Sequence, residues 1–312
     1  MSGLEQMVAD YLLLRRSLGY KLDHAEYILT RFVDYVQTVD SSQAVTVANA
    51  VAFATAPPGA SRRWQALRLS AIRGFARWAQ TIDSTIEVPP MRLLPARPTR
   101  TAPYIYSDAE IGALLGAAQR LRPAIRAATY RTLIALMAAT GLRTGETIGL
   151  NIASLDQQAG TLTVTGKYGK TRKLPLHQTT AEALAQYLDQ RDELLPAANC
   201  PALLISTRGT RLRASVVQQT FRRLGVETGL RTRSNACRPR LHDLRHTFAV
   251  STMLDAYTCG GDPAAALPLL ATWLGHSEPS DTYWYLTGTT ELLAAAAERL
   301  AGHHDDQRGD SA

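Results

Sequence analysis

Cysteine is scarce in this sequence, and the cysteines that are present follow no recognisable pattern. Cys200, Cys237 and Cys259 are odd in number and lack the Cys-x-x-Cys spacing. Neither a disulfide framework nor a cysteine zinc cluster is therefore supported. We expect reduced thiols in the cytoplasm, and a protein that uses no metal and no cofactor.

Long apolar runs and a secretory signal are also missing. No stretch approaches the roughly 18 apolar residues of a membrane span. The first residues, Met1 to Gln6, lack a basic segment followed by an apolar core. We therefore expect no membrane partner. The hydrophobic fraction of 46% over 312 residues is sufficient to fill one large core or two smaller ones.

Acidic residues are outnumbered, and the imbalance is local. The chain has 34 Lys and Arg against 27 Asp and Glu, a net charge of +7. Residues 51–100 hold eight arginines against Asp83 and Glu87, and residues 208–240 hold nine against Glu227 alone. This excess is larger than a solvated surface usually requires. It indicates a polyanionic partner, such as double-stranded DNA.

The N-terminal part is typical of a small helical bundle with a basic side. Apolar residues recur at helical spacing over 4–18 and 25–39. Ser61 is placed to cap a third helix. We expect that helix to bury Trp64, Leu67, Ala71, Phe75 and Trp78 and to leave its arginines on other faces.

A proline-rich segment separates this bundle from the rest of the chain. Four prolines between 89 and 98 disfavour both helix and sheet, so the segment is predicted to be an extended linker. We expect a helical domain with a basic side at 1–88, the linker at 89–103, a second domain at 104–302 and a polar tail at 303–312.

The second predicted domain, residues 104–302, combines helices with one hairpin. Ser107 and Glu110 form a capping-box pattern before an apolar helix. Residues 161–165 and 171–176 alternate as paired strands do. Further helices are expected at 124–139, 180–195, 214–224 and 242–256. The predicted fold class is mainly α with a small antiparallel β-sheet, an α+β fold.

The side chains needed to break a DNA phosphodiester without a metal all occur in this part: Arg143, His242, Arg245, His276 and Tyr285. The reaction adds negative charge to the non-bridging oxygens, and arginine offers a permanent positive charge and a planar fork to two of them. Histidine donates hydrogen bonds or transfers protons, and tyrosine supplies a nucleophile. Taken alone, Arg143 has a simpler explanation as a cation at a helix C-terminus.

Short motifs surround these side chains in a fixed order: Thr140-Gly-Leu-Arg143-Thr-Gly-Glu146, Gly166-Lys167, His242-Asp-Leu-Arg245-His, Leu274-Gly-His276 and Tyr285. Together they resemble the motif set of the tyrosine recombinases, the phage integrase family. The resemblance covers roughly residues 101–300 by motif. Residues 1–90 fit the family's helical, SAM-like core-binding domain by position and character only.

The resemblance implies a role for each matching residue. Arg143 and Arg245 would clamp the scissile phosphate while His242 and His276 donate hydrogen bonds to it. Lys167 would protonate the leaving 5′ oxygen, and Tyr285 would form a 3′-phosphotyrosyl intermediate. Glu146 would orient the site from behind the arginines. Candidate DNA contacts outside the catalytic set are Arg62, Arg63, Arg73, Arg77, Lys170 and Arg172.

Some of these assignments have competitors. Lys167 lies close to Lys170 and Lys173, so only the family pattern singles it out. Tyr283 is the alternative nucleophile, two residues before Tyr285. Two other motifs are rejected: Gly169-Lys-Thr lacks the first glycine of a P-loop, and the helix that begins at His242 lacks the glutamate of a zinc-binding His-Glu-x-x-His.

The resemblance also implies an assembly on DNA. The two domains would form a clamp around the duplex, and four copies would act on two sites, with companion recombinases of the same element as further partners. The 34-residue separation of His242 and His276 and the Leu-Thr-Gly after Tyr285 favour a mobile-element integrase or transposase. Residues 289–301 would dock on a neighbouring copy or on their own domain. The alternatives are a non-catalytic DNA-binding protein of the same fold and an enzyme like type IB topoisomerase.

Overall fold

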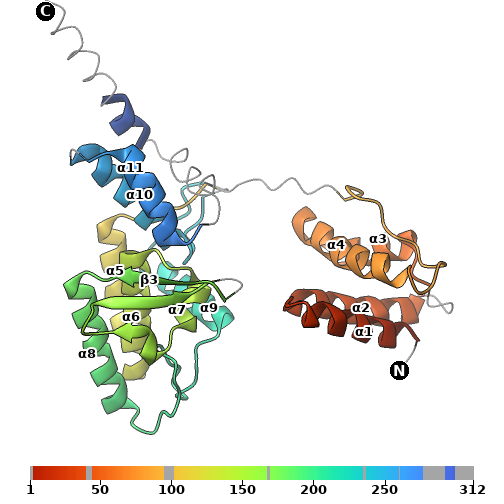
Figure 1. The fold of residues 1–312 in the computed structure, drawn as a ribbon, viewed down its shortest axis with the longest axis horizontal. Helices are drawn as coiled ribbons and strands as arrows, with labels where there is room; N and C mark the ends of the chain where they lie inside the picture. Colours follow the sequence, from red (N-terminus) through yellow and green to blue (C-terminus); the bar gives the residue numbers. More distant parts are fainter. Residues whose placement is uncertain are drawn as a thin grey trace, which may run out of the picture. The chain divides into compact units, whose positions relative to one another are not determined.

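The chain folds as two compact units, Met1–Arg100 and Thr101–Ala312, each of which has its own hydrophobic core. The structure is a computed structural model that describes residues 3–39, 44–94, 102–166, 169–234, 237–259, 261–276 and 292–298. We call the two parts the N-terminal unit and the C-terminal unit, and describe each by itself (Figure 1).

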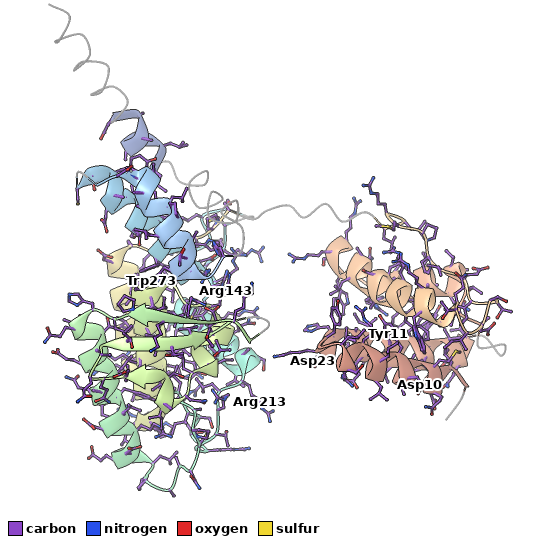
Figure 2. All side chains as sticks on the ribbon, in the orientation of Figure 1. Asp10, Tyr11, Asp23, Arg143, Arg213 and Trp273 are labelled. Carbon is purple, nitrogen blue, oxygen red and sulfur yellow. The ribbon has the colours of Figure 1, made fainter. Side chains whose placement is uncertain are left out.

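The N-terminal unit is a bundle of the helices α1 Gly3–Ser17, α2 Asp23–Val39, α3 Val47–Thr55 and α4 Arg62–Ala79. Ser61 caps α4 by accepting a hydrogen bond from the backbone N–H of Trp64. The Tyr11 side chain lies in the bundle core, where its ring meets Phe75 edge-on at 5.7 Å (Figure 2). The helical character expected of residues 1–88 is present.

The buried face of α4 differs from the expected one. Leu69, Ile72 and Phe75 are fully buried, whereas Leu67 is 46% exposed. The predicted tryptophans, Trp64 and Trp78, are only half-buried at the edge of the core. The prediction for Leu67 was wrong because the helix turns the stripe that begins at Arg68 and Leu69 toward α2 and α3, and the wide indole rings lie beside that stripe.

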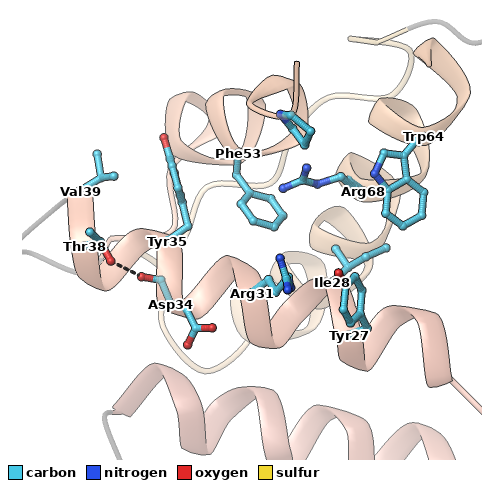
Figure 3. A pocket seen from close by; sticks show the side chains of 11 residues that line it. Tyr27, Ile28, Arg31, Asp34, Tyr35, Thr38, Val39, Phe53, Trp64 and Arg68 are labelled. Atoms are coloured by element: carbon cyan, nitrogen blue, oxygen red, sulfur yellow. Dashed lines mark hydrogen bonds between the residues drawn. The ribbon is translucent and has the colours of Figure 1, made fainter. Parts of the chain in front are cut away.

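A pocket of about 630 Å³ opens between α2, α3 and α4 (Figure 3). The guanidinium carbon of Arg68 lies 3.8 Å from the centre of the Phe53 ring, and Arg68 is only 8% exposed. Burial lowers the pKa of Arg68. Among the described residues Arg68 makes no hydrogen bond or ion pair, so the aromatic ring is its main partner.

The C-terminal unit is built around one helix. Its elements are α5 Asp108–Gln119, α6 Ala124–Thr140, α7 Thr144–Gly149, the 3-10 turn η1 Ile152–Ser154, β1 Leu155–Asp156, β2 Thr161–Thr165, β3 Thr171–Pro175, α8 Gln178–Leu194, α9 Ala214–Glu227, α10 Asp243–Thr258 and α11 Pro263–Leu274. The central helix, α6, packs against α5, α7, α8 and α10 (Figure 1). Residues 292–298 are also helical, and Leu292 packs on the cluster formed by α10 and α11.

The sheet is small and antiparallel, with the strand order β1-β2-β3. Its register pairs Leu162 with Leu174 and Val164 with Arg172. Leu162, Val164 and Leu174 are buried, so one face of the hairpin covers the core. The predicted α+β class and the predicted hairpin are confirmed. Among the described residues, no helix is both long and apolar enough to cross a membrane.

Candidate active site

The junction between α6 and α7 sets the position of Arg143. Gly141 ends α6 with φ of +64°, and a Cβ there would lie 2.5 Å from the ring of Phe248. Glycine is therefore required both by the left-handed backbone and by the close packing. Arg143 follows at the start of α7, where its backbone N–H donates to Glu146 at 3.1 Å. It does not cap the end of α6, which was its simpler explanation.

Arg245 lies on α10 and is 1% exposed. Nη1 donates to the carbonyl oxygen of Gly141 at 2.9 Å, and Nη2 donates to that of Leu274 at 2.8 Å. Nη2 is also 2.8 Å from Nε2 of His276. A buried cation needs such a set of acceptors to offset its lost hydration. Arg245 thereby joins the ends of α6 and α11.

Glu146 is the carboxylate behind the arginines. It accepts hydrogen bonds from Nη1 of Arg143 at 2.8 Å and from Nη2 of Arg172 at 2.9 Å, and its side chain is 5% exposed. Burial by itself would raise the pKa of Glu146, but the hydrogen bonds from Arg172 and Arg143 outweigh it, and the pKa is lowered. Glu146 is therefore ionised in the folded protein at neutral pH.

His242 is the N-cap residue directly before α10, and His246 follows one turn later, with their rings edge-to-face at 5.2 Å. The pKa of His242 is lowered to about 4, first because burial removes water from the ring and then because of the positive charges of Arg245, Arg240 and Arg143. More than a third of the residue's surface is nevertheless exposed, so one side of His242 faces solvent. Both observations describe a neutral imidazole with an accessible edge.

The structure thus brings five predicted residues into one place: Arg143, Glu146, His242, Arg245 and His276. The guanidiniums of Arg143 and Arg245 share the carbonyl oxygen of Leu274 as an acceptor, at 3.4 and 2.8 Å. Figure 2 labels Arg143 and Trp273 in the C-terminal unit. The other catalytic predictions, Lys167, Tyr285 and the alternative Tyr283, lie outside the described residues.

The candidate DNA contacts differ in exposure. Four of them are exposed to solvent: Arg62, Arg63 and Arg77 on α4, and Lys170 in the hairpin turn. Arg73 is half-buried and donates to the carbonyl oxygens of Pro89 and Pro90 at 2.8 and 2.9 Å. Arg172 is paired with Glu146 and is only 16% exposed. The side chains of Arg73 and Arg172 therefore make hydrogen bonds to other groups of the protein.

No group of three His, Cys, Asp or Glu side chains within the described ranges is arranged to hold a metal ion. Cys200, Cys237 and Cys259 are free thiols. What the site gathers instead is cationic and hydrogen-bonding: three guanidiniums and two imidazoles around one carboxylate. Such a site is suited to bind an oxyanion such as a phosphate.

Comparison with known proteins identifies the family. The Phage integrase family matches residues 106–291. The protein y4rB of Sinorhizobium fredii, assigned as an integrase/recombinase, is 39% identical over 98% of this chain and 100% of its own length. The chain belongs to the phage integrase family. Tyrosine recombinase XerC of Escherichia coli O157:H7 is 32% identical to this recombinase over 78% of the chain and 75% of XerC.

The fold of the recombinase is also found in solved structures. It superimposes on XerH site-specific recombinase bound to palindromic difH substrate, a post-cleavage complex, with a TM-score of 0.66 at 20% identity. That match covers 95% of the recombinase and 84% of XerH. The protein is a tyrosine-type site-specific recombinase, an enzyme that cleaves and rejoins DNA.

Arg172 and Trp273 have contacts in the recombinase site that the sequence did not predict. Arg172 was interpreted as a DNA contact, although it has the same strand parity as the buried Leu174, which places it on the inward face. Trp273 had no predicted role, yet its Nε1 donates to the carbonyl oxygen of Thr140 at 2.9 Å and its ring stacks on Phe248. Strand alternation was a signal for Arg172, whereas no local pattern marks Trp273.

Proposed function

We propose that the recombinase holds the scissile phosphate with Arg143 and Arg245 and attacks it with Tyr285. The observation that carries this proposal is the carbonyl oxygen of Leu274, which both guanidiniums share. Two cations held side by side complement the charge that develops on the non-bridging oxygens. The side chain of Arg143 is 34% exposed, and within the described residues its Nε and Nη2 make no hydrogen bond. Those donors are available to an oxyanion.

The proposed cleavage step balances its protons. The phenol oxygen of Tyr285 forms a bond to phosphorus, the bond between phosphorus and the 5′ oxygen breaks, and Lys167 gives a proton to that oxygen. The phenol proton passes to the neutral imidazole of His242, whose pKa of about 4 rises when an anionic phosphate binds beside it. His276 donates to a phosphate oxygen from Nδ1–H, because Nε2 faces Arg245.

Rejoining is the reverse of cleavage. The 3′-phosphotyrosyl bond keeps the energy of the broken phosphodiester, so a 5′ hydroxyl of a second strand can displace the tyrosine. No step in this scheme consumes ATP or uses a metal ion. Because a 5′ hydroxyl must reach the phosphotyrosyl bond, the scheme requires the two DNA ends to stay bound while they are exchanged.

The proposed substrate is a pair of duplex DNA sites, bound by four copies of the chain. The two units would act together as a clamp, with exposed cations such as Arg62, Arg63 and Arg77 contacting the backbone. The match to the integrase/recombinase y4rB over 100% of its own length supports an integrase, and companion recombinases of the same mobile element are further proposed partners.

A nicked duplex that loses its short 5′ fragment on cleavage tests this function, because the covalent product cannot be rejoined. The expected result is a protein–DNA adduct that disappears in Tyr285→Phe and persists in Tyr283→Phe, a matched control two residues away. Loss of the adduct in Tyr283→Phe alone would move the nucleophile to Tyr283.

The other readings predict different outcomes of the same assay. Tight binding without any adduct would indicate a DNA-binding protein that lacks turnover. Relaxation of supercoils by single copies, on DNA without paired sites, would indicate a topoisomerase-like enzyme. We expect the adduct to form equally well in excess chelator, and its loss there would contradict the metal-independent scheme.

A further inference from the structure

All three guanidinium nitrogens of Arg172 donate hydrogen bonds to groups of the C-terminal unit. Its Nη1 and Nη2 donate to the two carboxylate oxygens of Glu146, at 3.3 and 2.9 Å. Its Nε donates to the carbonyl oxygen of Trp273 at 2.8 Å. A planar guanidinium can make these bonds at once, because its donors point in fixed directions within one plane.

These bonds connect segments that are distant in the sequence. Arg172 belongs to β3, Glu146 to α7, and Trp273 to the last turn of α11. Glu146 in turn holds Arg143, and the residue after Trp273 supplies the carbonyl oxygen that Arg245 binds. Arg172 is thus the link between the hairpin and the groups that bind phosphate.

The link reaches the turn that carries Lys167. A Cβ on Gly166 would lie 3.7 Å from Oε1 of Glu146 and 3.8 Å from Nη1 of Arg172. The backbone N–H of Gly166 also donates to the carbonyl oxygen of Lys170 at 2.8 Å, which closes the turn. The residue directly before Lys167 is therefore packed against the pair of Arg172 and Glu146.

The position of Arg172 also explains why residue 275, in the Leu-Gly-His motif, is a glycine. A Cβ on Gly275 would lie 2.8 Å from Nη1 of Arg172, and the φ of Gly275 is +67°. The chain can therefore turn from α11 to His276 only because no side chain occupies the place of the guanidinium. Arg172 therefore lies close both to Gly166 in the hairpin and to Gly275 after α11.

We propose that Arg172 is a positioning residue for the leaving-group step. It fixes the β2–β3 hairpin relative to Arg143 and Arg245, so that the amine of Lys167 meets the 5′ oxygen of a phosphate held by these two arginines. This inference rests on the proposed function, in which Lys167 supplies that proton. Arg172 itself contacts no DNA in this role, which differs from its interpretation as a DNA contact.

A sulfur in place of the bridging 5′ oxygen separates this role from a general structural one. A thiol is a much stronger acid than an alcohol, so the 5′ thiolate leaves without a proton from Lys167. A variant that has only lost the placement of the acid regains its rate on the sulfur substrate. A variant with a damaged phosphate clamp or nucleophile stays slow on both substrates.

We expect Arg172→Gln to slow adduct formation by about 10²-fold on the oxygen substrate, in the range of a lost general acid. On the sulfur substrate the deficit should shrink to less than about fivefold. Arg172→Lys should show an intermediate deficit with the same rescue, because an amine cannot span both Glu146 and the carbonyl of Trp273. Equal deficits on both substrates, or none on either, would overturn the proposal.

Two controls complete the experiment. Thr171→Ala removes an exposed side chain from the same strand and should leave both rates unchanged. Lys167→Ala should be rescued by sulfur in the same way as Arg172→Gln. If the wild-type enzyme forms no adduct at all, the proposed function fails. If wild type reacts and sulfur rescues Lys167→Ala but not Arg172→Gln, only the role of Arg172 fails.

Discussion

Nη2 of Arg245 lies 2.8 Å from Nε2 of His276. A guanidinium can only donate, so the ring nitrogen accepts and carries no proton. The neutral imidazole of His276 therefore has its proton on Nδ1. This single contact fixes the tautomer of His276.

Replacing Arg245 should damage stability and chemistry together. In Arg245→Lys one amine must serve the carbonyls of Gly141 and Leu274 as well as His276, and it cannot reach all three. We expect the free energy of unfolding to fall by about 2–4 kcal/mol, and the adduct rate to fall by at least about 10²-fold. Urea unfolding measures the change in stability, and adduct formation on the nicked duplex measures the change in rate. Arg222 is exposed on α9, and Arg222→Lys should change neither the free energy of unfolding nor the adduct rate.

Gly141 should not tolerate a methyl group. In Gly141→Ala the new Cβ would lie 2.5 Å from Phe248 at a φ of +64°, so the turn before Arg143 must shift. We expect a loss of about 2 kcal/mol or more in thermal or urea unfolding. Gly145→Ala is the matched control on α7, where a Cβ meets nothing within 4 Å. Since alanine favours helix, this control should be neutral or stabilising, and a similar loss in both variants would contradict the explanation.

Glu146→Gln should destabilise the C-terminal unit by about 3 kcal/mol, because it leaves Arg143 and Arg172 without their buried counter-charge. The pKa of Glu146 is lowered in the folded state, so its contribution is present above the unfolded pKa. The difference between wild type and Gln should therefore be constant above about pH 5 and shrink below about pH 4.3. Unfolding free energies from pH 7 to 3.5 measure it, and a difference that grows in acid would refute this account.

His246 should make the protein acid-sensitive. Its pKa is lowered to about 3, first by burial and then by electrostatic interaction with His242, Arg240, Arg245 and His276. Since the folded pKa lies below the unfolded value near 6.5, the unfolded state takes up the proton first, and stability falls as pH drops from about 6.5 toward 3.

The size of this effect follows from the linkage. At pH 5 the loss from His246 is about 2 kcal/mol relative to pH 7. His246→Gln removes the titrating group, so its unfolding free energy should change less over this interval. Parallel curves for the variant and the wild type would show that His246 does not cause the loss. Asp243, 3.8 Å from His246, is itself bound by Arg240 and should be left intact in the comparison.

Arg68 should be replaced more easily by methionine than by lysine. Its guanidinium lies on the Phe53 ring with no hydrogen bond or ion pair among the described residues. Methionine keeps the apolar stem, whereas lysine buries a more strongly hydrated charge that cannot stack flat on the ring. We expect Arg68→Lys to be at least about 1 kcal/mol less stable than Arg68→Met in urea unfolding. The reverse order would contradict this view of the pocket.

Local patterns in the sequence determined much of this protein. Strand alternation predicted the hairpin, the capping box at Ser107 predicted the start of α5, and the order of the motifs identified the chemistry. The same patterns failed on α4, where helical spacing did not decide which stripe of residues faces the core. Periodicity defines a face, but the neighbouring helices decide how far the face is turned.

The tertiary structure alone decided which groups meet. Arg172 and Glu146 are 26 residues apart, and Arg245 finds Gly141 at a separation of 104 residues. Such partners depend on how α7, α10, α11 and the hairpin pack. Hydrogen bonds form only over a few ångströms, and separation along the sequence does not give the distance between two residues in the folded protein. The sequence by itself therefore determined the family and the residues proposed for catalysis. Packing decided that Arg172 faces a carboxylate inside the site and that Nε2 of His276 faces Arg245.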